Sequence, residues 1–193
     1  MESAPRIILD TSLFVNPSTQ KHFGTNTDTA VEGIVNTSDE HGISLYMPRS
    51  VYREMANFVS EEALMLFRRY ATVRGPDLYN QQVPAALFHT FIGDLRQRVN
   101  KGLAVAEKAI RSEDRPENIR WVRQRYREAM RSGIVDSVED FEVVLLAKEV
   151  GGVILSADEG IANMAEDLGI EVLSAKEFLN RHVSKKASPT HDR

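Results

Sequence analysis

Short apolar runs alternate with helical patterns at both ends of the chain. Arg6–Leu9 is a run of the kind buried in a parallel sheet, and Ile43–Met47 alternates until Pro48 stops it. Val153–Leu155 and Ile170–Leu173 are two further predicted strands. Helical patterns lie between and after them, at residues 27–35, 50–59, 136–150, 160–168 and from 175 onward. Strands separated by helices predict an α/β fold with a parallel sheet and right-handed crossovers.

Residues typical of turns and helix caps indicate where the predicted helices and strands begin and end. Asn16-Pro17 predicts a loop, and Gly151-Gly152 predicts a helix end. Ser174 and Glu177 have the spacing of a capping box at the start of a last helix. Ser50 is a predicted N-cap for a helix with one apolar face, formed by Val51, Met55, Phe58 and Val59.

The middle of the chain has a different pattern. An apolar residue recurs every four positions, which predicts one long helix: Leu87, Phe91, Leu95, Val99 and Leu103. A second helical stripe follows a predicted capping box at Asp114 and Glu117, and it comprises Ile119, Val122, Tyr126 and Met130. Together these helices predict an αα-hairpin, residues 76–131, inserted into an α/β body formed by residues 1–75 and 132–193. Its first stripe is too long for the shorter helix to cover, so we expect it to pack against a second subunit.

The net charge also differs between the predicted hairpin and the rest of the chain. Residues 74–131 hold 12 Lys and Arg against 7 Asp and Glu, a net +5, while the remainder carries −9 of the overall −4. Arg120, Arg123 and Arg127 share one helix face beside Trp121 and Tyr126. Long helices often carry solvated arginines, but an Arg-lined helix also suits duplex RNA, which is recognised by shape and backbone.

Composition excludes several classes of function. The chain has no cysteine, which excludes disulfides, thiolate metal sites and cysteine nucleophiles. No signal peptide and no membrane-spanning run is present in the sequence, so we expect a cytoplasmic protein without membrane partners.

Four aspartates form the candidate site. Asp10 and Asp158 each follow an apolar strand, and sites in open parallel sheets form outside the carboxyl ends of strands. Asp136 and Asp140 are one helical turn apart and share a face. Four carboxylates brought together repel one another unless cations lie between them, and Mg²⁺ or Mn²⁺ suits all-oxygen ligands.

Each acid also has a purely structural interpretation. Asp10 suits a turn, Asp158 a helix cap, and Asp136 a capping box with Glu139. Asp140 is harder to explain in this way, because its helix face continues into Val144 and Ala147, and a buried charge needs a partner. Three further acids are possible ligands. Glu54 lies at the edge of an apolar stripe, and its alternative is an ion pair with Arg53 or another base. Glu142 and Glu159 are acids of a kind that more often lie solvated on the surface.

The remaining chemistry is metal-assisted attack of water on a phosphodiester. The sequence has no glycine-rich phosphate loop, no nucleophile-elbow serine and no histidines at metal-ligand spacing. Two cations about 3.5–4 Å apart would lower the pKa of the attacking water and stabilise the leaving oxygen.

Three motifs resemble the acidic pattern of PIN-domain ribonucleases, in particular the small RNA-free ribonuclease P proteins of the HARP group. They are Leu9–Pro17 with Asp10-Thr11-Ser12, Met47–Glu54, and Val135–Asp140. Ser156-Ala157-Asp158 is similar to the last acidic position, and the basic hairpin is similar to the spike insertion of that group.

The resemblance implies a three-layer α/β/α sandwich and a specific reaction. Such a protein removes the 5′ leader of precursor tRNA with a divalent metal and no RNA subunit, and it assembles into homo-oligomers through its hairpin. The catalytic set carries over to Asp10, Asp136, Asp140 and Asp158, with Glu54 from the wider PIN pattern. Two alternatives stay open: a toxin-type PIN endoribonuclease acting on tRNA or rRNA, and a non-catalytic RNA-binding PIN scaffold.

Overall fold

The computed structural model describes residues 4–111, 116–130 and 137–183 of the 193-residue chain. The chain divides into two compact units, each described here by itself. We call Met1–Gln81 with Val138–Arg193 the body, and Gln82–Ser137 the hairpin unit.

The body is built on a parallel sheet of five strands. They are β1 (Arg6–Leu9), β2 (Ser44–Met47), β3 (Ala71–Val73), β4 (Val153–Leu155) and β5 (Val172–Leu173). Their order is β3-β2-β1-β4-β5, and every neighbouring pair is parallel. The chain therefore starts in the middle of the sheet, builds outward to β3, and later resumes beside β1 on the other side. This confirms the α/β prediction and places the reversal of strand order between β1 and β4.

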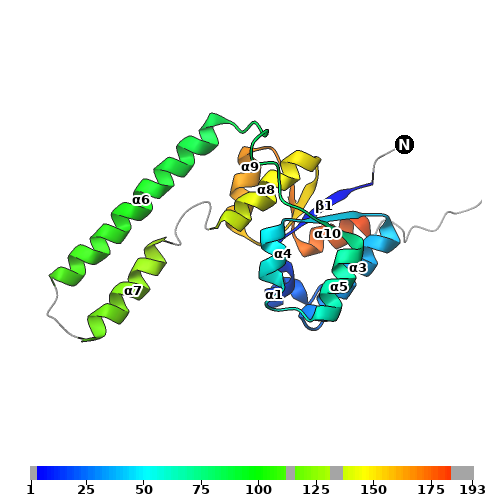
Figure 1. Cartoon of the computed structure of the whole chain (residues 1–193), viewed down its shortest axis with the longest axis horizontal. Coiled ribbons are helices and arrows are strands. Elements are labelled where there is room, and N and C mark those ends of the chain that lie inside the picture. Colours follow the sequence, from blue (N-terminus) through cyan, green and yellow to red (C-terminus); the bar gives the residue numbers. More distant parts are fainter. Residues whose placement is uncertain (1–3, 112–115, 131–136, 184–193) are drawn as a thin grey trace, which may run out of the picture. The chain divides into compact units, whose positions relative to one another are not determined.

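Helices flank this sheet (Figure 1). α3 packs against α5, and α8 packs against α9, β1 and α4. The bounds of the body helices are α1 (Ser12–Val15), α2 (Pro17–Gln20), α3 (Thr27–His41), α4 (Arg49–Met55), α5 (Glu61–Tyr70), α8 (Val138–Val150), α9 (Glu159–Asp167) and α10 (Ala175–His182). The parallel sheet with helices packed around it is the PIN-like α/β architecture that the resemblance implied.

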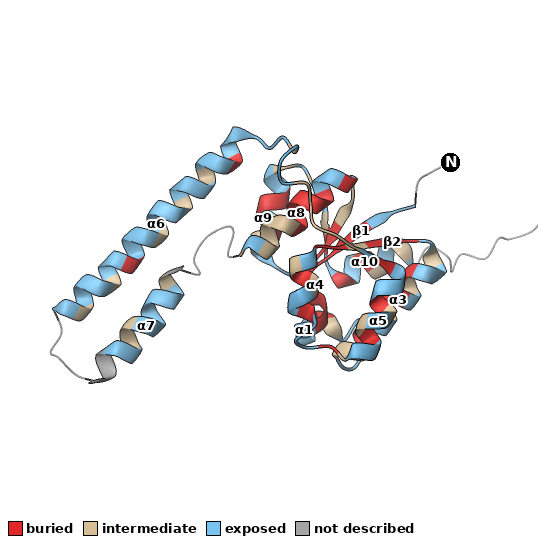
Figure 2. Ribbon diagram, viewed as in Figure 1, coloured by how far each residue is buried: buried red, intermediate tan, exposed pale blue. Residues whose placement is uncertain are grey.

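The core lies between the sheet and these helices. Ile7, Ile8 and Leu9 of β1 are at most 1% exposed, as expected for a central strand covered on both faces. Five consecutive α8 residues, 143–147, are also buried, so this helix contacts its surroundings on most sides. Figure 2 shows the buried residues concentrated in the sheet and the inner faces of the body helices.

The start of the body differs from the sequence prediction. Asn16-Pro17 does not begin a loop but joins two short helices, α1 and α2. The Asn16 side chain accepts a hydrogen bond from the Ser18 amide at 3.0 Å, and Pro17 takes the first helical position. Proline suits that position because the missing N–H would have no partner within the helix.

The helix after β2 also differs. α4 begins at Arg49, with Pro48 as its N-cap residue and no side-chain cap, so the predicted Ser50 cap is wrong. α4 ends at Met55, which removes Phe58 from its apolar face and leaves that side chain 54% exposed. The sequence prediction also lacked α5 and β3. β3 is a three-residue edge strand with almost no periodicity to detect. α5 did carry local signals, since Ser60 caps it and Glu61 and Glu62 lie in its first turn.

The later boundaries follow the local signals. α8 ends at Val150, and Gly151 follows with φ +61°, the left-handed conformation that glycine adopts without strain. Ser174 and Glu177 form the predicted capping box of α10. β5 is shorter than expected, since only Val172 and Leu173 pair with β4.

The hairpin unit consists of α6 (Ala85–Ile110) and α7 (Pro116–Met130). The two helices meet where Gly102 faces Tyr126: a Cβ on Gly102 would lie 2.8 Å from Tyr126 Cε2. Lys108 Nζ lies 5.7 Å from the centre of the Trp121 ring, within range of a cation–π contact. The predicted Asp114–Glu117 capping box lies outside the residues whose side chains the structure describes.

Candidate metal and nuclease site

Asp10 is the centre of a buried hydrogen-bond cluster. It follows β1 directly, and the residue is 7% exposed. Its Oδ1 accepts a hydrogen bond from the Thr11 amide at 2.7 Å, while Oδ2 accepts one from Ser12 Oγ at 2.5 Å and one from Ser156 Oγ at 2.9 Å. These donors are neutral, so they fix the carboxylate without cancelling its charge. A cation nearby would be stabilised strongly by such a carboxylate.

Ser156 connects Asp10 to Asp158. β1 and β4 pair with Leu9 opposite Leu155, so Asp10 and Ser156 are the next residues on two neighbouring strands. The Asp158 amide donates to Ser156 Oγ at 3.0 Å, and Asp158 Oδ1 accepts from the Ile161 amide at 3.0 Å. Asp158 is therefore the N-cap of α9, and the residue itself is exposed. The cap and ligand interpretations are compatible, because the cap bond uses only one carboxylate oxygen.

The position of this cluster follows from the strand order. β1 and β4 are neighbours at the reversal point, so the residues that follow their carboxyl ends lie at the same edge of the sheet. The prediction that the strands before Asp10 and Asp158 are neighbours is confirmed. Two acids that are 148 positions apart in sequence thus reach the same edge of the sheet.

α4 contributes two polar residues one helical turn apart. Thr11 Oγ1 donates a hydrogen bond to Glu54 Oε2 at 2.7 Å, which ties this exposed glutamate to the residue after Asp10. Ser50 Oγ donates to Glu142 Oε2 on α8. α4 therefore lies between the end of β1 and the start of α8, with a hydrogen bond to each.

α8 carries the second acidic segment. Asp140 lies in its first turn and is partly exposed, and its helix face continues into Val144 and Ala147, both buried. Glu142 is also partly exposed and is held by Ser50. Asp136 lies outside the described residues, and Glu159 is the exposed first residue of α9.

The donor set suits a hard divalent cation. Every candidate ligand offers oxygen, the donor that Mg²⁺ and Mn²⁺ prefer. Within residues 4–111, 116–130 and 137–183, however, no three Asp, Glu, His or Cys side chains come together as a metal-binding group. The four-aspartate metal site therefore stays a prediction.

Two serines of this region make contacts that the sequence patterns did not predict. Ser156 follows the strand 153–155 as Asp10 follows β1, and that parallel was the available signal for its contact with Asp10. Ser50 was interpreted as a cap, and no local pattern indicates that its hydroxyl reaches α8 instead. Thr11 and Ser12, which were expected near the site, are both hydrogen-bonded within it.

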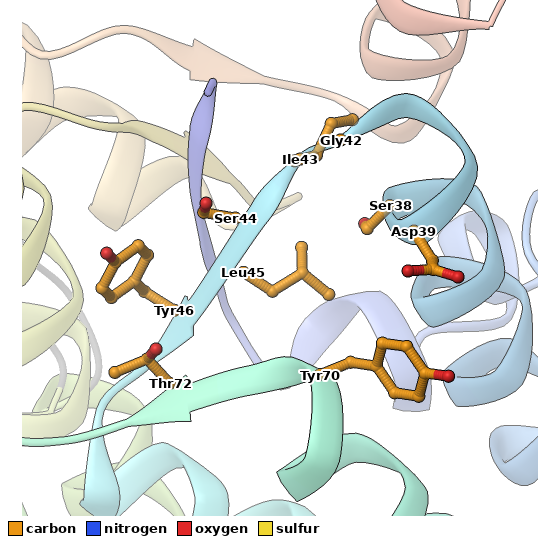
Figure 3. Close-up of a pocket in the computed structure, with 9 residues that line it drawn as sticks. All are labelled: Ser38, Asp39, Gly42, Ile43, Ser44, Leu45, Tyr46, Tyr70 and Thr72. Carbon is orange, nitrogen blue, oxygen red and sulfur yellow. The ribbon is translucent and has the colours of Figure 1, made fainter. Parts of the chain in front are cut away.

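A cavity of about 240 Å³ lies elsewhere in the body, around the start of β2 (Figure 3). Its lining includes Ser38, Asp39, Gly42 and Tyr70, and none of the predicted site residues. Because it borders the first residues of β2, it lies toward the opposite end of the strand from Pro48 and α4. This cavity is separate from the candidate site.

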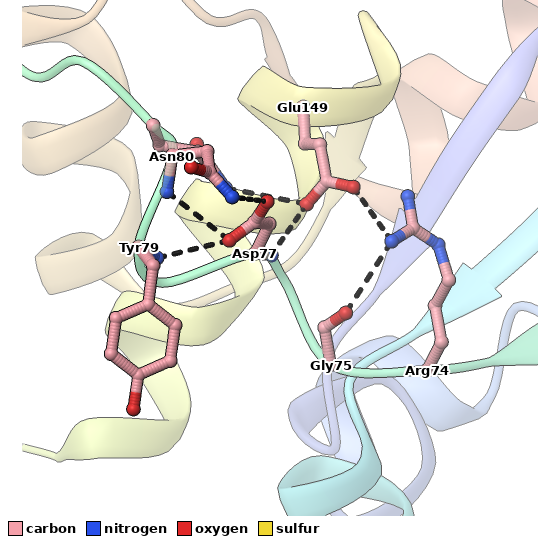
Figure 4. A network of polar contacts seen from close by, with 7 residues as sticks. Arg74, Gly75, Asp77, Tyr79, Asn80 and Glu149 are labelled. Carbon is pink, nitrogen blue, oxygen red and sulfur yellow. Dashed lines mark hydrogen bonds and ion pairs between the residues drawn. The ribbon is translucent and has the colours of Figure 1, made fainter.

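A second polar network lies before the hairpin unit (Figure 4). Glu149 of α8 accepts hydrogen bonds from the Asp77 amide and from Arg74 Nη1, both at 2.7 Å. The Asp77 amide, and then Arg74, hold the pKa of the Glu149 carboxyl below its ordinary value of 4.5. Asn80 and the amide of Tyr79 donate to Asp77 and lower its pKa in the same way. This network fixes the segment between β3 and α6 to the body.

The chain is similar to known ribonucleases along nearly its whole length. The family model described as PINc domain ribonuclease matches residues 6–183. A protein from Pyrococcus furiosus named RNA-free ribonuclease P is 41% identical over 193 residues, covering 95% of this chain and 96% of the relative. Proteins of the same name from Thermodesulfovibrio yellowstonii and Alkalilimnicola ehrlichii are 35% and 38% identical, and they cover 90% and 88% of this chain.

Among solved structures, a PilT N-terminus domain protein from Sulfolobus solfataricus P2 covers 97% of this chain and 99% of its own, at 10% identity and a TM-score of 0.43. The sequence similarity to the named relatives runs nearly from end to end. The chain belongs to the PINc-domain ribonucleases, within the RNA-free ribonuclease P family.

Proposed function

We propose that this endoribonuclease removes the 5′ leader of precursor tRNA without an RNA subunit, by metal-dependent hydrolysis of a phosphodiester. The observation that carries the proposal is the near full-length similarity to proteins named RNA-free ribonuclease P, together with a buried, hydroxyl-held Asp10 at the sheet's reversal point.

The proposed ligands are Asp10, Asp136, Asp140 and Asp158, with Mg²⁺ or Mn²⁺ as the cation and Glu54, Glu142 and Glu159 as further candidates. A divalent cation held there would lower the pKa of a water molecule and stabilise developing negative charge. Asp10 would be held in one orientation by Ser12 and Ser156, so little rearrangement is needed on binding. The α9 cap at Asp158 restricts that side chain as well.

The hairpin, residues 76–131 in the predicted division, is the proposed RNA-binding insertion. Arg120, Arg123 and Arg127 of α7 are exposed and spaced on one face. Arg127 Nε donates to the Arg123 carbonyl at 3.1 Å, so its side chain follows the helix axis. A row of guanidinium groups along a helix can contact successive phosphates of duplex RNA.

The same unit is the proposed oligomer interface. Phe91, Leu95, Val99 and Leu103 are 45–57% exposed in the chain by itself, while Leu87 is already buried. Neighbouring Phe88 and Ile92 widen this apolar surface and are 63% and 41% exposed. Burying a continuous stripe against the identical stripe of a second copy gives a closed, self-complementary contact.

Mapping the cut on a precursor tRNA tests the function. The proposal expects one cut at the junction of leader and mature 5′ end, dependent on Mg²⁺ and abolished by EDTA and by Asp10→Asn. Cuts inside the mature tRNA or in rRNA would indicate a toxin-type PIN nuclease instead. RNA binding without any cleavage would indicate a non-catalytic scaffold.

A further inference from the structure

The hydroxyl of Ser50 on α4 reaches the acidic segment of α8. α4 has no side-chain cap at its start, so Ser50 does not serve its own helix in the usual way for a serine near an N-terminus. Its Oγ instead donates to Glu142 Oε2, a residue 92 positions further along the chain. The two helices pack directly against each other, which makes this contact part of the α4–α8 interface.

Helix geometry connects this bond with Asp140. Successive residues turn by about 100° around a helix, so Glu142 lies about 200° from Asp140. Asp140 shares its face with the fully buried Val144 and Ala147, on the core side of α8, whereas Glu142 is bonded from α4. The bond to Glu142 therefore ties the first turns of α8, which carry Asp140, to α4.

The other end of α4 shows a matching arrangement. Glu54, one turn after Ser50, accepts the hydrogen bond from Thr11 beside Asp10. The two bonds connect α4 to both acidic segments: one through a serine that donates, the other through a glutamate that accepts. On its apolar side α4 is anchored by Val51 and Met55, which are at most 1% exposed. A rigid helix with such an anchor can set the distance between two groups of carboxylates.

We infer that Ser50 is a positioning residue of the nuclease site, whose hydroxyl holds Glu142 and so orients the start of α8 for binding a divalent cation. The inference rests on the proposed metal-dependent function. Residues that orient ligands without touching the metal typically change metal affinity or activity by about 10–100-fold when they are removed.

Direct Mn²⁺ titration of the full-length protein without RNA, beside the Mg²⁺ dependence of precursor cleavage, tests this role. We call the Mn²⁺ concentration at half-maximal binding and the Mg²⁺ concentration at half-maximal cleavage the metal midpoints. We expect Ser50→Ala to raise both of them by about tenfold. Ser50→Thr keeps the hydroxyl and should restore wild-type midpoints. Cleavage at saturating Mg²⁺ should change much less than the midpoint does.

Ser60→Ala is the matched control. Ser60 caps α5 through a hydrogen bond from the Ala63 amide at 3.3 Å, so this variant also loses one serine hydroxyl bond in the body. It should lower the thermal midpoint and leave the metal midpoints unchanged. Unchanged metal midpoints in Ser50→Ala, or equal shifts in Ser50→Thr and Ser50→Ala, would overturn the inference.

A double-variant cycle with Glu142 separates an effect through Glu142 from a general effect of Ser50→Ala on the fold. If Ser50 acts through Glu142, adding Ser50→Ala to Glu142→Ala should not shift the Mn²⁺ midpoint further, whereas an additive shift would contradict that route. Failure of the wild-type protein to bind Mn²⁺ and to cleave would reject the proposed function itself. Wild-type binding and cleavage with an unaffected Ser50→Ala would reject only the role of Ser50.

Discussion

The body and the hairpin unit bury their apolar residues to very different extents. In the body, β1 lies under helices and its three apolar side chains are at most 1% exposed. In the hairpin unit, the only buried residues of α6 are Leu87 and Gly102, and the stripe from Phe91 to Leu103 stays about half exposed. Figure 2 shows this contrast as buried colour through the body and mostly exposed or intermediate colour along α6 and α7.

An apolar stripe can be covered within its own chain or by a second surface, and the two units are examples of each expectation. A strand inside a doubly covered sheet has its partners within the same chain, so its burial is intrinsic. Two antiparallel helices can cover only one side of each other, and a stripe wider than that side needs a further partner. We therefore expect the body to fold by itself and the hairpin unit to need a second apolar surface.

Removing the charge of Asp10 should give the largest effect on activity. Asp10→Asn keeps the shape of the side chain, so the body should stay folded while cleavage falls by about two orders of magnitude or more. Single-turnover cleavage of precursor tRNA, beside thermal unfolding, measures both. Asp39→Asn, an exposed acid of α3 away from the site, is the control. Near-normal cleavage by folded Asp10→Asn would reject the assignment of Asp10.

Truncating an apolar side chain in each unit should show whether that side chain is buried by its own chain or by a second copy. Ile8→Ala removes a fully buried side chain of β1, and we expect it to lower the free energy of unfolding by about 2–5 kcal/mol. Leu95→Ala, measured at low protein concentration, should cost less than about 1 kcal/mol. Urea unfolding followed by circular dichroism compares them. Equal costs at every concentration would mean that Leu95 is as well covered within its own chain as Ile8.

A charge in the stripe should split the assembly. Leu95→Glu would bury a carboxylate against the apolar stripe of a second copy, so dissociation to a smaller species with a folded body is expected. Light scattering gives the mass directly. Met65→Glu makes the same kind of change on α5 of the body, where Met65 is 65% exposed, and should leave the mass as it is. An unchanged mass for Leu95→Glu would contradict the proposed interface.

Removing two arginines of α7 should weaken RNA binding more modestly. Each phosphate contact contributes about one unit to the slope of log K against log salt, so Arg123→Ala with Arg127→Ala should flatten that slope by about two. Binding of precursor tRNA at several salt concentrations measures it. The pair Arg68→Ala and Arg69→Ala, exposed on α5, is the control. An unaltered slope would leave the hairpin with a role in assembly alone.

The smallest effect is expected at Glu149, which fixes the segment leading to α6. Its pKa is lowered in the folded protein, so its contribution to stability is present above the ordinary value of 4.5 and is lost as the pH falls through the folded value. Glu149→Gln should therefore lower stability at pH 7 by up to about 1 kcal/mol. The difference in the free energy of unfolding between Glu149→Gln and the wild type should become smaller below pH 4.5. Denaturant unfolding between pH 3 and 7 measures this difference. A difference that is the same at every pH would contradict a stabilising role of the Glu149 carboxylate.

Local patterns were sufficient for much of the fold. The apolar run before Asp10, the glycine after Val150 and the capping box at Ser174 each act within a few residues, and each was confirmed. The helical stripe of the hairpin was confirmed as α6 for the same reason. The Ser50 cap was wrong because α4 begins two residues earlier, after Pro48, which leaves the Ser50 hydroxyl for another partner.

Local sequence patterns were enough to predict where β1 and β4 end, where α10 is capped, and where an apolar stripe exceeds what one short helix can cover. The hydrogen bonds from Ser156 to Asp10, 146 positions apart, and from Ser50 to Glu142, 92 positions apart, could be found only in the folded chain. Hydrogen bonds of that kind depend on the order of strands in the sheet and on which helices pack together. Those arrangements come from burial of the whole core, which no local spacing of residues encodes.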